Sequence, residues 1–544
     1  MLLDLGRAVR RMTAGRIHFS VAAALYLTLF TMVVAAGATV LHNQAGAAGQ
    51  AASSRLASAQ THPRYLVLFV LDGARPDYFG LTRLPHVDAL RAQGTQYTNA
   101  IDGILESETP AGHTTLATGS TPRRDGILGF NWAQNDNDFS LFSPDVIRAG
   151  AMERIMQQAG TPTIAGLYKA RFPRARVVAL SGHKYYAADP LGGPSADAIM
   201  YYQGDSAGRY VPVAIPGHVP PAGVLTAPGL IAPSTHLPYG LDDALATRLA
   251  LSAFRVMHQR LTLINEPEFD WPLGHVDGGS LSRARVITLM QSFDRDLGLI
   301  EKAYRKAGIL DRTLFVITAD HGMAPVTHFI ASTVITNAVA RARTTAPSIA
   351  YNSAAYVWIK DASKAPAVAQ NILSARDPGI TAVYYLRQVK GWSGYVRAPG
   401  PYVNPGVEAT NQYLLKTLMN GHQPTVVAFT RTDATFSSSA THWKADHGGA
   451  TWQSQHIPLI LSGPGIRAGQ VLSQPAQLDD VAPTVLADMG VRPTGMEGQI
   501  LTDALQTPAA ADQQARAAEV RTAQPLVWAL LAEDAYERAH PLSH

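Results

Sequence analysis

The sequence contains no cysteine and few charged residues. The absence of cysteine excludes disulfide frameworks, cysteine-ligated zinc, iron–sulfur clusters and thiol catalysis, so any metal site must use His, Asp and Glu. Charged residues make up 16% of the chain and hydrophobic residues 47%, a balance that excludes wholesale disorder and a coiled coil. A chain of 544 residues is long enough for one large domain with an insertion, or for about two to three smaller domains.

The net charge of +4 does not indicate a nucleic-acid-binding surface. Most of that charge comes from the first 16 residues, which contain four arginines and one aspartate. The rest of the chain is nearly neutral, whereas a nucleic-acid surface needs clustered Lys and Arg. We therefore expect no nucleic-acid partner.

Residues 17–41 form a long apolar run without Asp, Glu, Lys or Arg. A helix of about 20 apolar residues spans a bilayer. Arginines precede the run, and the next Lys or Arg is Arg55. This asymmetry predicts a transmembrane signal anchor, with residues 1–16 in the cytoplasm and the remainder of the chain outside it. Small residues follow the run, so a cleaved signal peptide and secretion are the alternative. Residues 42–62, rich in Ala, Gly, Gln and Ser, are typical of a linker.

The pattern from residue 63 to residue 505 is that of an α/β domain. Continuous apolar runs predict strands that are buried on both faces of a sheet, at 65–71, 261–265, 313–318 and 457–461. Helical patterns lie between them, at about 84–93, 148–159, 242–260 and 281–307. The alternation predicts a doubly wound, mostly parallel sheet with helices on both faces. In such sheets chemistry gathers beyond the carboxyl ends of the strands.

Three stretches depart from this alternation. Residues 203–240 are rich in Pro and Gly and predict a long surface loop. Residues 327–440 contain short strand-like pieces, which predict an inserted α+β subdomain. Residues 506–544 predict a C-terminal helical tail.

Polar residues follow or precede the buried strands in four places. These residues are Asp72, Asp270 with His275, Asp320 with His321, and Asp446 with His447. A single Asp after a strand is most often a helix cap or a turn residue. Four such places along one sheet edge would instead gather carboxylates and imidazoles, whose mutual repulsion a divalent cation relieves. Imidazole and carboxylate without thiolate suit zinc or manganese.

Thr109 and Pro110 predict the start of a short helix, as N-cap and first helical residue. Thr109 then either serves only as a cap or has a chemical role. Backbone N–H groups at a helix N-terminus favour an anion such as phosphate. A metal bound to the hydroxyl would lower its pKa and make it a nucleophile.

The order of these motifs resembles the alkaline phosphatase superfamily, and within it the type I phosphodiesterase/nucleotide pyrophosphatase branch. The resemblance runs from about Tyr65 to Leu501 and is weakest through 330–440. It rests on VLDG, T-x-x-G-H-x-x-L-x-T-G, D…GH, T-A-D-H-G-M, and D-H-G-G before an IPLI strand. Together these motifs are specific, although each alone is weak. The fold that the resemblance implies is the alkaline-phosphatase-like α/β fold.

The resemblance also implies roles for individual residues. Thr109 corresponds to the nucleophile, which forms a phosphothreonine that water then cleaves. Asp72, Asp320 and His321 correspond to the ligands of one metal, bridged to Thr109. The other metal corresponds to Asp270, His275 and His447. Family members of this kind usually hold two zinc ions, and manganese is the other possibility here.

Three departures from the family pattern affect the assignment. The spacing from Asp270 to His275 is five rather than four, which leaves Glu268 and Asp277 as alternatives to Asp270. The phosphate-binding Asn of the family would be Asn131, one position later than expected. Lys184 is a candidate for the phosphate pocket, and a solvated surface lysine is the alternative.

A sulfatase assignment is disfavoured. Residues 120–124 match the S-x-P-x-R pattern of sulfatases, but in sulfatases that motif opens the helix, whereas Ser120 follows the Thr118–Gly119 step. Thr109 holds the position of the sulfatase nucleophile, and threonine cannot become formylglycine.

The sequence therefore predicts a membrane-tethered, two-metal hydrolase of small phosphate esters, most simply a phosphodiesterase or nucleotide pyrophosphatase. A phosphomonoesterase or a phosphonate hydrolase with the same core is the first alternative. A catalytically inactive, membrane-anchored binding protein is the second.

Overall fold

The computed structural model describes residues 62–226, 230–231, 238–437 and 443–542. The predicted anchor at 17–41 lies outside these ranges, as do residues 1–16 and 42–61. Within the described ranges, no helix combines the length and the apolar character that crossing a bilayer requires.

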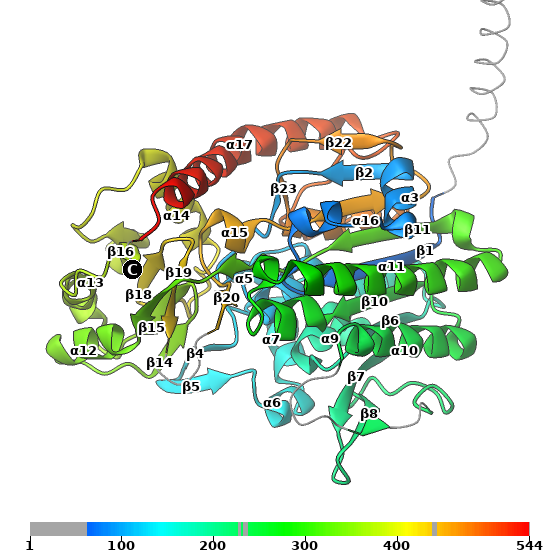
Figure 1. Cartoon of the computed structure of the whole chain (residues 1–544), viewed down its shortest axis with the longest axis horizontal. Coiled ribbons are helices and arrows are strands. Elements are labelled where there is room, and N and C mark those ends of the chain that lie inside the picture. Colours follow the sequence, from blue (N-terminus) through cyan, green and yellow to red (C-terminus); the bar gives the residue numbers. More distant parts are fainter. Residues whose placement is uncertain (1–61, 227–229, 232–237, 438–442, 543–544) are drawn as a thin grey trace, which may run out of the picture. The chain divides into compact units, whose positions relative to one another are not determined.

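A ten-stranded mixed sheet forms the centre of the part that begins at His62 (Figure 1). Its order is β22-β2-β21-β11-β1-β10-β6-β7-β8-β9. The strands are β1 (Tyr65–Leu71), β2 (Gly94–Tyr97), β6 (Val177–Ser181), β7 (Ala198–Gly204), β8 (Arg209–Ala214), β9 (Leu230–Ile231), β10 (Leu261–Glu266), β11 (Thr313–Thr318), β21 (Leu459–Ser462) and β22 (Gln470–Leu472). The central strands β11, β1, β10, β6 and β7 are parallel. Antiparallel pairs lie outside them, so the sheet is less parallel than the sequence predicts.

The central strands are buried on both faces, as their continuous apolar runs predict. Every residue of β10 and β11 is buried, and in β1 only Tyr65 is partly exposed. Two groups of helices cover the sheet. One group contains α3 (Pro85–Gln93), α10 (Leu241–Met257) and α11 (Arg283–Lys306). The other contains α4 (Thr109–Thr118), α8 (Ile164–Arg171), α9 (Tyr185–Gly192) and α16 (Val481–Asp488).

The predicted surface loop at 203–240 is partly wrong, because it contains strand β8. This strand pairs antiparallel with β7 from Met200↔Ala214 to Gly204↔Tyr210. Pro and Gly suggested a loop, but Pro212 lies in the outer part of the sheet, where β9 pairs only with Arg209 and Tyr210. A proline without an N–H is tolerated there because no neighbouring strand needs that donor.

The predicted insertion is an α+β unit with its own sheet. Its five strands are antiparallel, in the order β14 (Ser348–Tyr351), β15 (Ala354–Trp358), β18 (Val426–Thr430), β16 (Ile380–Val389) and β17 (Trp392–Arg397). One face packs against α12 (Thr333–Arg341) and α13 (Ala365–Leu373) in a separate core. Residues on the opposite face, such as Tyr356, belong to the main core. The insertion is therefore packed into the domain rather than attached to it as a free cap.

The predicted C-terminal tail contains one long helix, α17 (Ala510–Ala539). It packs against α14 (Pro405–Lys416) and α15 (Trp452–Gln455). Val527 and Leu530 of this helix are buried with Ile101 and Trp452. The segment is therefore part of the folded unit.

Candidate metal and phosphoryl-transfer site

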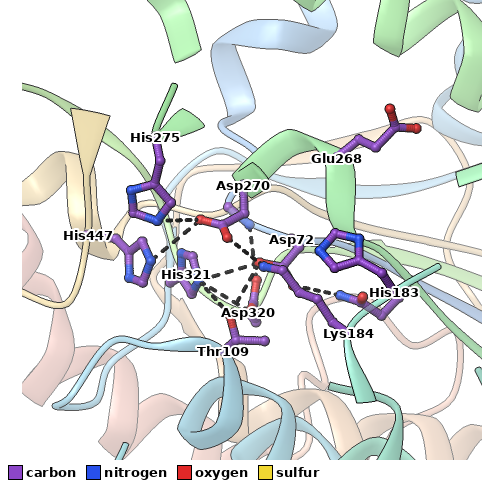
Figure 2. Close-up of polar contacts among 12 residues, drawn as sticks. Asp72, Thr109, His183, Lys184, Glu268, Asp270, His275, Asp320, His321 and His447 are labelled. Carbon is purple, nitrogen blue, oxygen red and sulfur yellow. Dashed lines mark hydrogen bonds and ion pairs between the residues drawn. The ribbon is translucent and has the colours of Figure 1, made fainter. Parts of the chain in front are cut away.

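The side chains that the sequence singles out at the strand ends converge in one place (Figure 2). They come from the loops after β1, β10 and β11, from the start of α4, and from the segment that follows β20 (Ala445–Asp446). All are at most 5% exposed: Asp72, Thr109, Asp270, His275, Asp320, His321 and His447. The parallel register of β11, β1 and β10 aligns the three strand ends and so explains the convergence.

The first half of the site surrounds Thr109. Its Oγ1 lies 3.4 Å from Asp72 Oδ1 and 3.4 Å from His321 Nε2. The same His321 Nε2 lies 3.4 Å from Asp320 Oδ2 and 3.6 Å from Asp72 Oδ1. One hydroxyl, one imidazole and two carboxylates thus present their ligand atoms to a common space.

The second half of the site centres on Asp270. Its Oδ1 lies 3.1 Å from His275 Nε2 and 3.5 Å from His447 Nε2. The two alternatives that the sequence left open are engaged elsewhere. Glu268 accepts hydrogen bonds from the backbone N–H groups of Gly240 and Asp243 and points away from the cluster (Figure 2). Asp277 pairs with Arg285 and Tyr239.

Backbone carbonyls orient the three imidazoles in the same way. The Nδ1 atoms of His275, His321 and His447 lie 2.9–3.0 Å from the carbonyl oxygens of Ala445, Gly322 and Ser107. A carbonyl oxygen only accepts, so each Nδ1 carries a proton, and Nε2 is the ring atom that can offer a lone pair to a metal. The Nε2 atoms face carboxylate oxygens, an arrangement that requires either a metal cation or a proton between the nitrogen and the oxygen.

Lys184 lies between the two halves of the site rather than on the surface. Its Nζ donates to Asp72 Oδ1 at 2.8 Å and to Asp270 Oδ2 at 2.5 Å, and the residue is 1% exposed. Burial alone would lower the pKa of Lys184, but Asp270 and Asp72 together hold it well above its ordinary value. One ammonium does not balance three buried carboxylates, so two negative charges remain among Asp72, Asp270, Asp320 and Lys184.

The pKa shifts of other side chains in the site also favour the binding of cations. Burial, then His321, lowers the pKa of His447 well below its ordinary value, which keeps the ring neutral and able to ligate. Burial and Asp320 raise the pKa of Asp72, although Lys184 opposes them. Among the described residues, Asp270 Oδ1 and Asp320 Oδ2 accept no backbone N–H, and each faces an imidazole nitrogen, of His275 at 3.1 Å and of His113 at 3.2 Å. Buried carboxylate and imidazole donors of this kind are those that bind zinc and manganese.

Three overlapping groups have ligand atoms within 4.8 Å of one another. They are Asp270 with His321 and His447, His275 with Asp446 and His447, and Asp72 with His113 and Asp320. His113 has partners at both ring nitrogens. Its Nδ1 lies 2.9 Å from Thr109 O and 3.2 Å from Asp320 Oδ2, and its Nε2 lies 3.0 Å from Asn265 Nδ2. His113 therefore holds Asp320 in place rather than offering a free lone pair.

Asn265 is a site residue that the sequence reasoning missed. Its Nδ2 donates to Asp72 Oδ2 at 2.8 Å and also approaches His113. It lies at the end of β10, as Asp72 follows β1, so a polar residue ending an apolar run was the available signal.

The helix that carries Thr109 begins one residue earlier than predicted. Glu108 is the N-cap, and Thr109 is the first helical residue, with Pro110 after it. The carbonyl of Glu108 accepts from Gly112 N at 2.8 Å, which sets the first turn. Gly112 is required by close packing, because a Cβ there would lie 2.4 Å from the carbonyl oxygen of Asp320. The T-x-x-G spacing thus brings Thr109 against the Asp320–His321 loop.

Asn131 lies near this helix but outside the polar cluster described above. It begins β4 (Asn131–Gln134) and is partly buried. The preceding residue, Phe130, donates its backbone N–H to Glu108 Oε2 at 2.9 Å. That bond holds the Asn131 segment beside the N-terminus of α4.

Comparison with known protein families identifies the chain. A family model described as type I phosphodiesterase / nucleotide pyrophosphatase matches residues 66–389, more than half of the chain. The chain therefore belongs to this family.

Two characterised relatives match shorter segments. Alkaline phosphatase PhoK of a Sphingomonas species is 31% identical over 157 residues, which cover 27% of this chain and 28% of that protein. Arylsulfatase K of Danio rerio is 32% identical over 82 residues, which cover 13% and 16%. Less than a third of either relative is thus aligned. The sulfatase-like Ser120 lies beyond α4, which ends at Thr118.

Solved structures share the fold over most of the chain. Alkaline phosphatase PafA superposes with a TM-score of 0.63 at 15% identity and covers 82% of this chain and 100% of its own. Murine ectonucleotide pyrophosphatase/phosphodiesterase 5, in an inactive form in complex with AMP, gives a TM-score of 0.56 at 14% identity with the same coverage. These likenesses establish the alkaline-phosphatase-like α/β fold.

Proposed function

We propose that this chain is a two-metal hydrolase of phosphate esters, a phosphodiesterase or nucleotide pyrophosphatase that works through a phosphothreonine at Thr109. One observation carries the proposal: the Thr109 hydroxyl, at the N-terminus of α4, lies 3.4 Å from both Asp72 Oδ1 and His321 Nε2. A hydroxyl in this position is next to metal-ligand atoms and to backbone N–H groups that favour a phosphate.

The ligand sets follow the two halves of the site. Asp72, Asp320 and His321, with Thr109, hold one cation, and Asp270, His275 and His447 hold the other. When bound, two such cations lower the pKa of a hydroxyl and neutralise charge on phosphate oxygens. The donor set of imidazole and carboxylate favours zinc, with manganese as the other candidate.

The chain's own residues support a double displacement. Thr109 Oγ1 gives up its proton to solvent and attacks phosphorus to form a new P–O bond, while the bond to the leaving oxygen breaks and that oxygen takes up a proton from solvent. Water then attacks the phosphothreonine, which releases the Thr109 oxygen and the phosphate product. Lys184 holds a non-bridging phosphate oxygen through its ammonium, and Asn131 contributes an amide donor to the same group.

The nucleophile is tested by two variants of Thr109. Thr109→Ala removes the attacking oxygen and should reduce turnover of bis-p-nitrophenyl phosphate by about a thousandfold or more, whereas Thr109→Ser keeps the oxygen and should retain measurable turnover. Undiminished hydrolysis by Thr109→Ala would remove Thr109 from the mechanism. A further arm is the trapping of ³²P on wild-type protein but not on Thr109→Ala.

A phosphomonoesterase is the second candidate, favoured by the local identity with alkaline phosphatase PhoK. Diester preference predicts a higher kcat/KM for bis-p-nitrophenyl phosphate than for p-nitrophenyl phosphate. Monoester rates far above diester rates would reverse the preference. If neither is turned over, an aryl phosphonate ester tests the phosphonate-hydrolase alternative. Inactivity on all three by metal-loaded protein would favour an inactive binding protein.

We also propose that residues 17–41 tether the protein to the membrane, with the catalytic domain outside the cytoplasm. Support comes from the apolar run and the arginines that precede it. The full-length protein should remain in the membrane fraction after alkaline carbonate washing, and its domain should be digestible by protease added outside the membrane. A mature chain in the soluble fraction that begins after residue 41 would instead establish signal-peptide cleavage.

A further inference from the structure

The turn between β14 and β15 of the insertion reaches the framework of the metal site. This turn is Asn352–Ser353. Asn352 Nδ2 donates to Glu108 Oε1 at 2.7 Å, and Glu108 directly precedes Thr109. The backbone N–H of Ser353 donates to the carbonyl of His447 at 2.9 Å. One turn of the inserted subdomain therefore contacts both the segment of the nucleophile and the segment of a metal-site histidine.

The Asn352–Glu108 contact has a defined donor and acceptor. Asn352 Oδ1 accepts from the backbone N–H of Ala354 at 2.9 Å, so Nδ2 must be the atom that faces Glu108. The other carboxylate oxygen of Glu108, Oε2, accepts from Phe130 N at 2.9 Å. Asn352 and Glu108 are 3% and 6% exposed, so water does not compete for these bonds. A buried amide-to-carboxylate bond of this kind is stronger than a neutral one.

The glycines of the D-H-G-G motif are explained by the same turn. A Cβ on Gly448 would lie 2.2 Å from Asn352 Nδ2, and a Cβ on Gly449 would lie 2.3 Å from the carbonyl oxygen of Ser353. The hydroxyl of Tyr356, on β15, also donates to the Gly448 carbonyl at 2.6 Å. The backbone after His447 is thus packed directly against the insertion.

The nucleophile segment and the histidine segment also meet each other. Ser107 forms a bridge with Gly448, and its carbonyl accepts from His447 Nδ1 at 2.9 Å. A shift of the Asn352 turn would therefore displace both halves of the site relative to one another. A displacement of about 1 Å in a reacting group can lower a rate by about a hundredfold.

We propose that Asn352 is a positioning residue for phosphoryl transfer, which fixes Thr109 through Glu108 and fixes His447 through the backbone of its own turn. This inference rests on the proposed function and deepens it. Asn352 acts through the two segments that it contacts, and neither substrate nor metal is its partner. The insertion is then a structural part of the reaction centre.

A donor–acceptor swap tests the pair. Asn352→Asp places two carboxylates face to face, and Glu108→Gln removes the charge of the acceptor. In the double variant Glu108→Gln/Asn352→Asp, the introduced amide N–H donates to the introduced carboxylate, while the amide carbonyl oxygen still accepts from Phe130. We expect Asn352→Asp to lower kcat by about tenfold to a hundredfold with little change in KM or in bound metal. The double variant should recover most of the lost kcat.

The matched control is Asn371→Asp in the same subdomain. Asn371 Nδ2 donates to Ala338 O at 3.1 Å, between two helices of the insertion and away from Thr109. This variant should keep the wild-type kcat. If Asn352→Asp does not fold, Asn352→Ala, which introduces no charge, replaces it with the same expected direction.

Each outcome separates the inference from the proposed function. Wild-type protein that turns over none of the phosphate esters would refute the proposed function. Wild-type turnover with an unchanged kcat in Asn352→Asp would refute only the positioning role. Equal losses in the single variant and in the swapped pair would also refute that role, because the restored bond would then carry no benefit.

Discussion

A metal ligand is useful only when its lone pair is held in the right direction, and at the residue scale this site uses backbone carbonyls for that purpose. Each of His275, His321 and His447 donates from Nδ1 to a carbonyl close to a strand end or to α4. The backbone thereby selects the tautomer, and Nε2 faces the carboxylates.

Removal of one imidazole should empty half of the site. We expect His447→Ala to lower the bound divalent metal from about two ions to about one per chain and to reduce hydrolysis by about a hundredfold or more. Plasma mass spectrometry of the purified protein measures the metal. His86→Ala is the control and should retain both ions, because His86 is a partly exposed residue of α3 whose partner is Glu301 of α11. Two ions retained by His447→Ala would argue against its role as a ligand.

Asp189 provides a pH-dependent prediction away from the metal ligands. It is 1% exposed, and neither carboxylate oxygen has a hydrogen-bond partner among the described residues. Burial, then Glu153, raises the pKa of Asp189 to about 8, with His218 opposing. The native state therefore keeps a proton that the unfolded state loses above about pH 4. The contribution of Asp189 to the free energy of unfolding is therefore complete below about pH 4. It is lost as the pH rises towards about 8.

The variant Asp189→Asn should remove this dependence. We define the difference as the free energy of unfolding of the variant minus that of the wild type. This difference should be larger at about pH 9 than at about pH 5, by at least about 1 kcal/mol. Urea unfolding at the two pH values measures the difference. The same difference at both values would show that Asp189 is not protonated in the native state.

Among the elements, α4 packs closely against the loop after β11 through Gly112. Gly112→Ala should lower the free energy of unfolding by about 2 kcal/mol or more, because the added Cβ meets the backbone of Asp320. It should also weaken metal binding, since Asp320 and His321 would move. Gly80→Ala is the control, because a Cβ at Gly80 meets no atom within 4 Å. Equal stability of the two variants, by thermal unfolding, would contradict the packing argument.

The elements differ in how far the sequence predicts them. Strands such as β1 and β11 are predicted well, because burial on both faces leaves a continuous apolar run. Helices α3, α10 and α11 likewise lie within one to three residues of the predicted bounds. Strand β8 was missed because edge pairing tolerates Pro212, which resembles a loop signal.

The roles of some site residues cannot be predicted from the sequence, because they depend on contacts between distant elements. The sequence spacing does not show whether Glu268, Asp270 or Asp277 is the metal ligand. In the structure Glu268 accepts a hydrogen bond from Gly240 and Asp277 pairs with Arg285, which leaves Asp270. Lys184 is ambiguous for the same reason, because its burial depends on Asp72 and Asp270 from two other strands. The Asn352–Glu108 bond joins positions 244 residues apart and leaves no local signature.

For the whole molecule, metal binding should be linked to folding. Cations that bind only the native state stabilise it by about 2.7 kcal/mol per site at a concentration one hundred times the dissociation constant. Chelation followed by dialysis should therefore lower the Tm by roughly 5 °C, and zinc or manganese should restore both Tm and activity. Magnesium at the same concentration is the control, because it prefers oxygen ligands. If chelation leaves the Tm unchanged, metal binding does not stabilise the fold.

The proposed mechanism requires two cations beside the hydroxyl of a single threonine. Anomalous X-ray diffraction from crystals of the metal-loaded protein, collected on both sides of the zinc edge, tests this most directly. We expect two peaks, one contacted by Asp72, Asp320, His321 and Thr109, and the other by Asp270, His275 and His447. Their separation should be about 3.5–4 Å. A single peak, no peak, or a Thr109 hydroxyl remote from the metal would contradict the proposed mechanism.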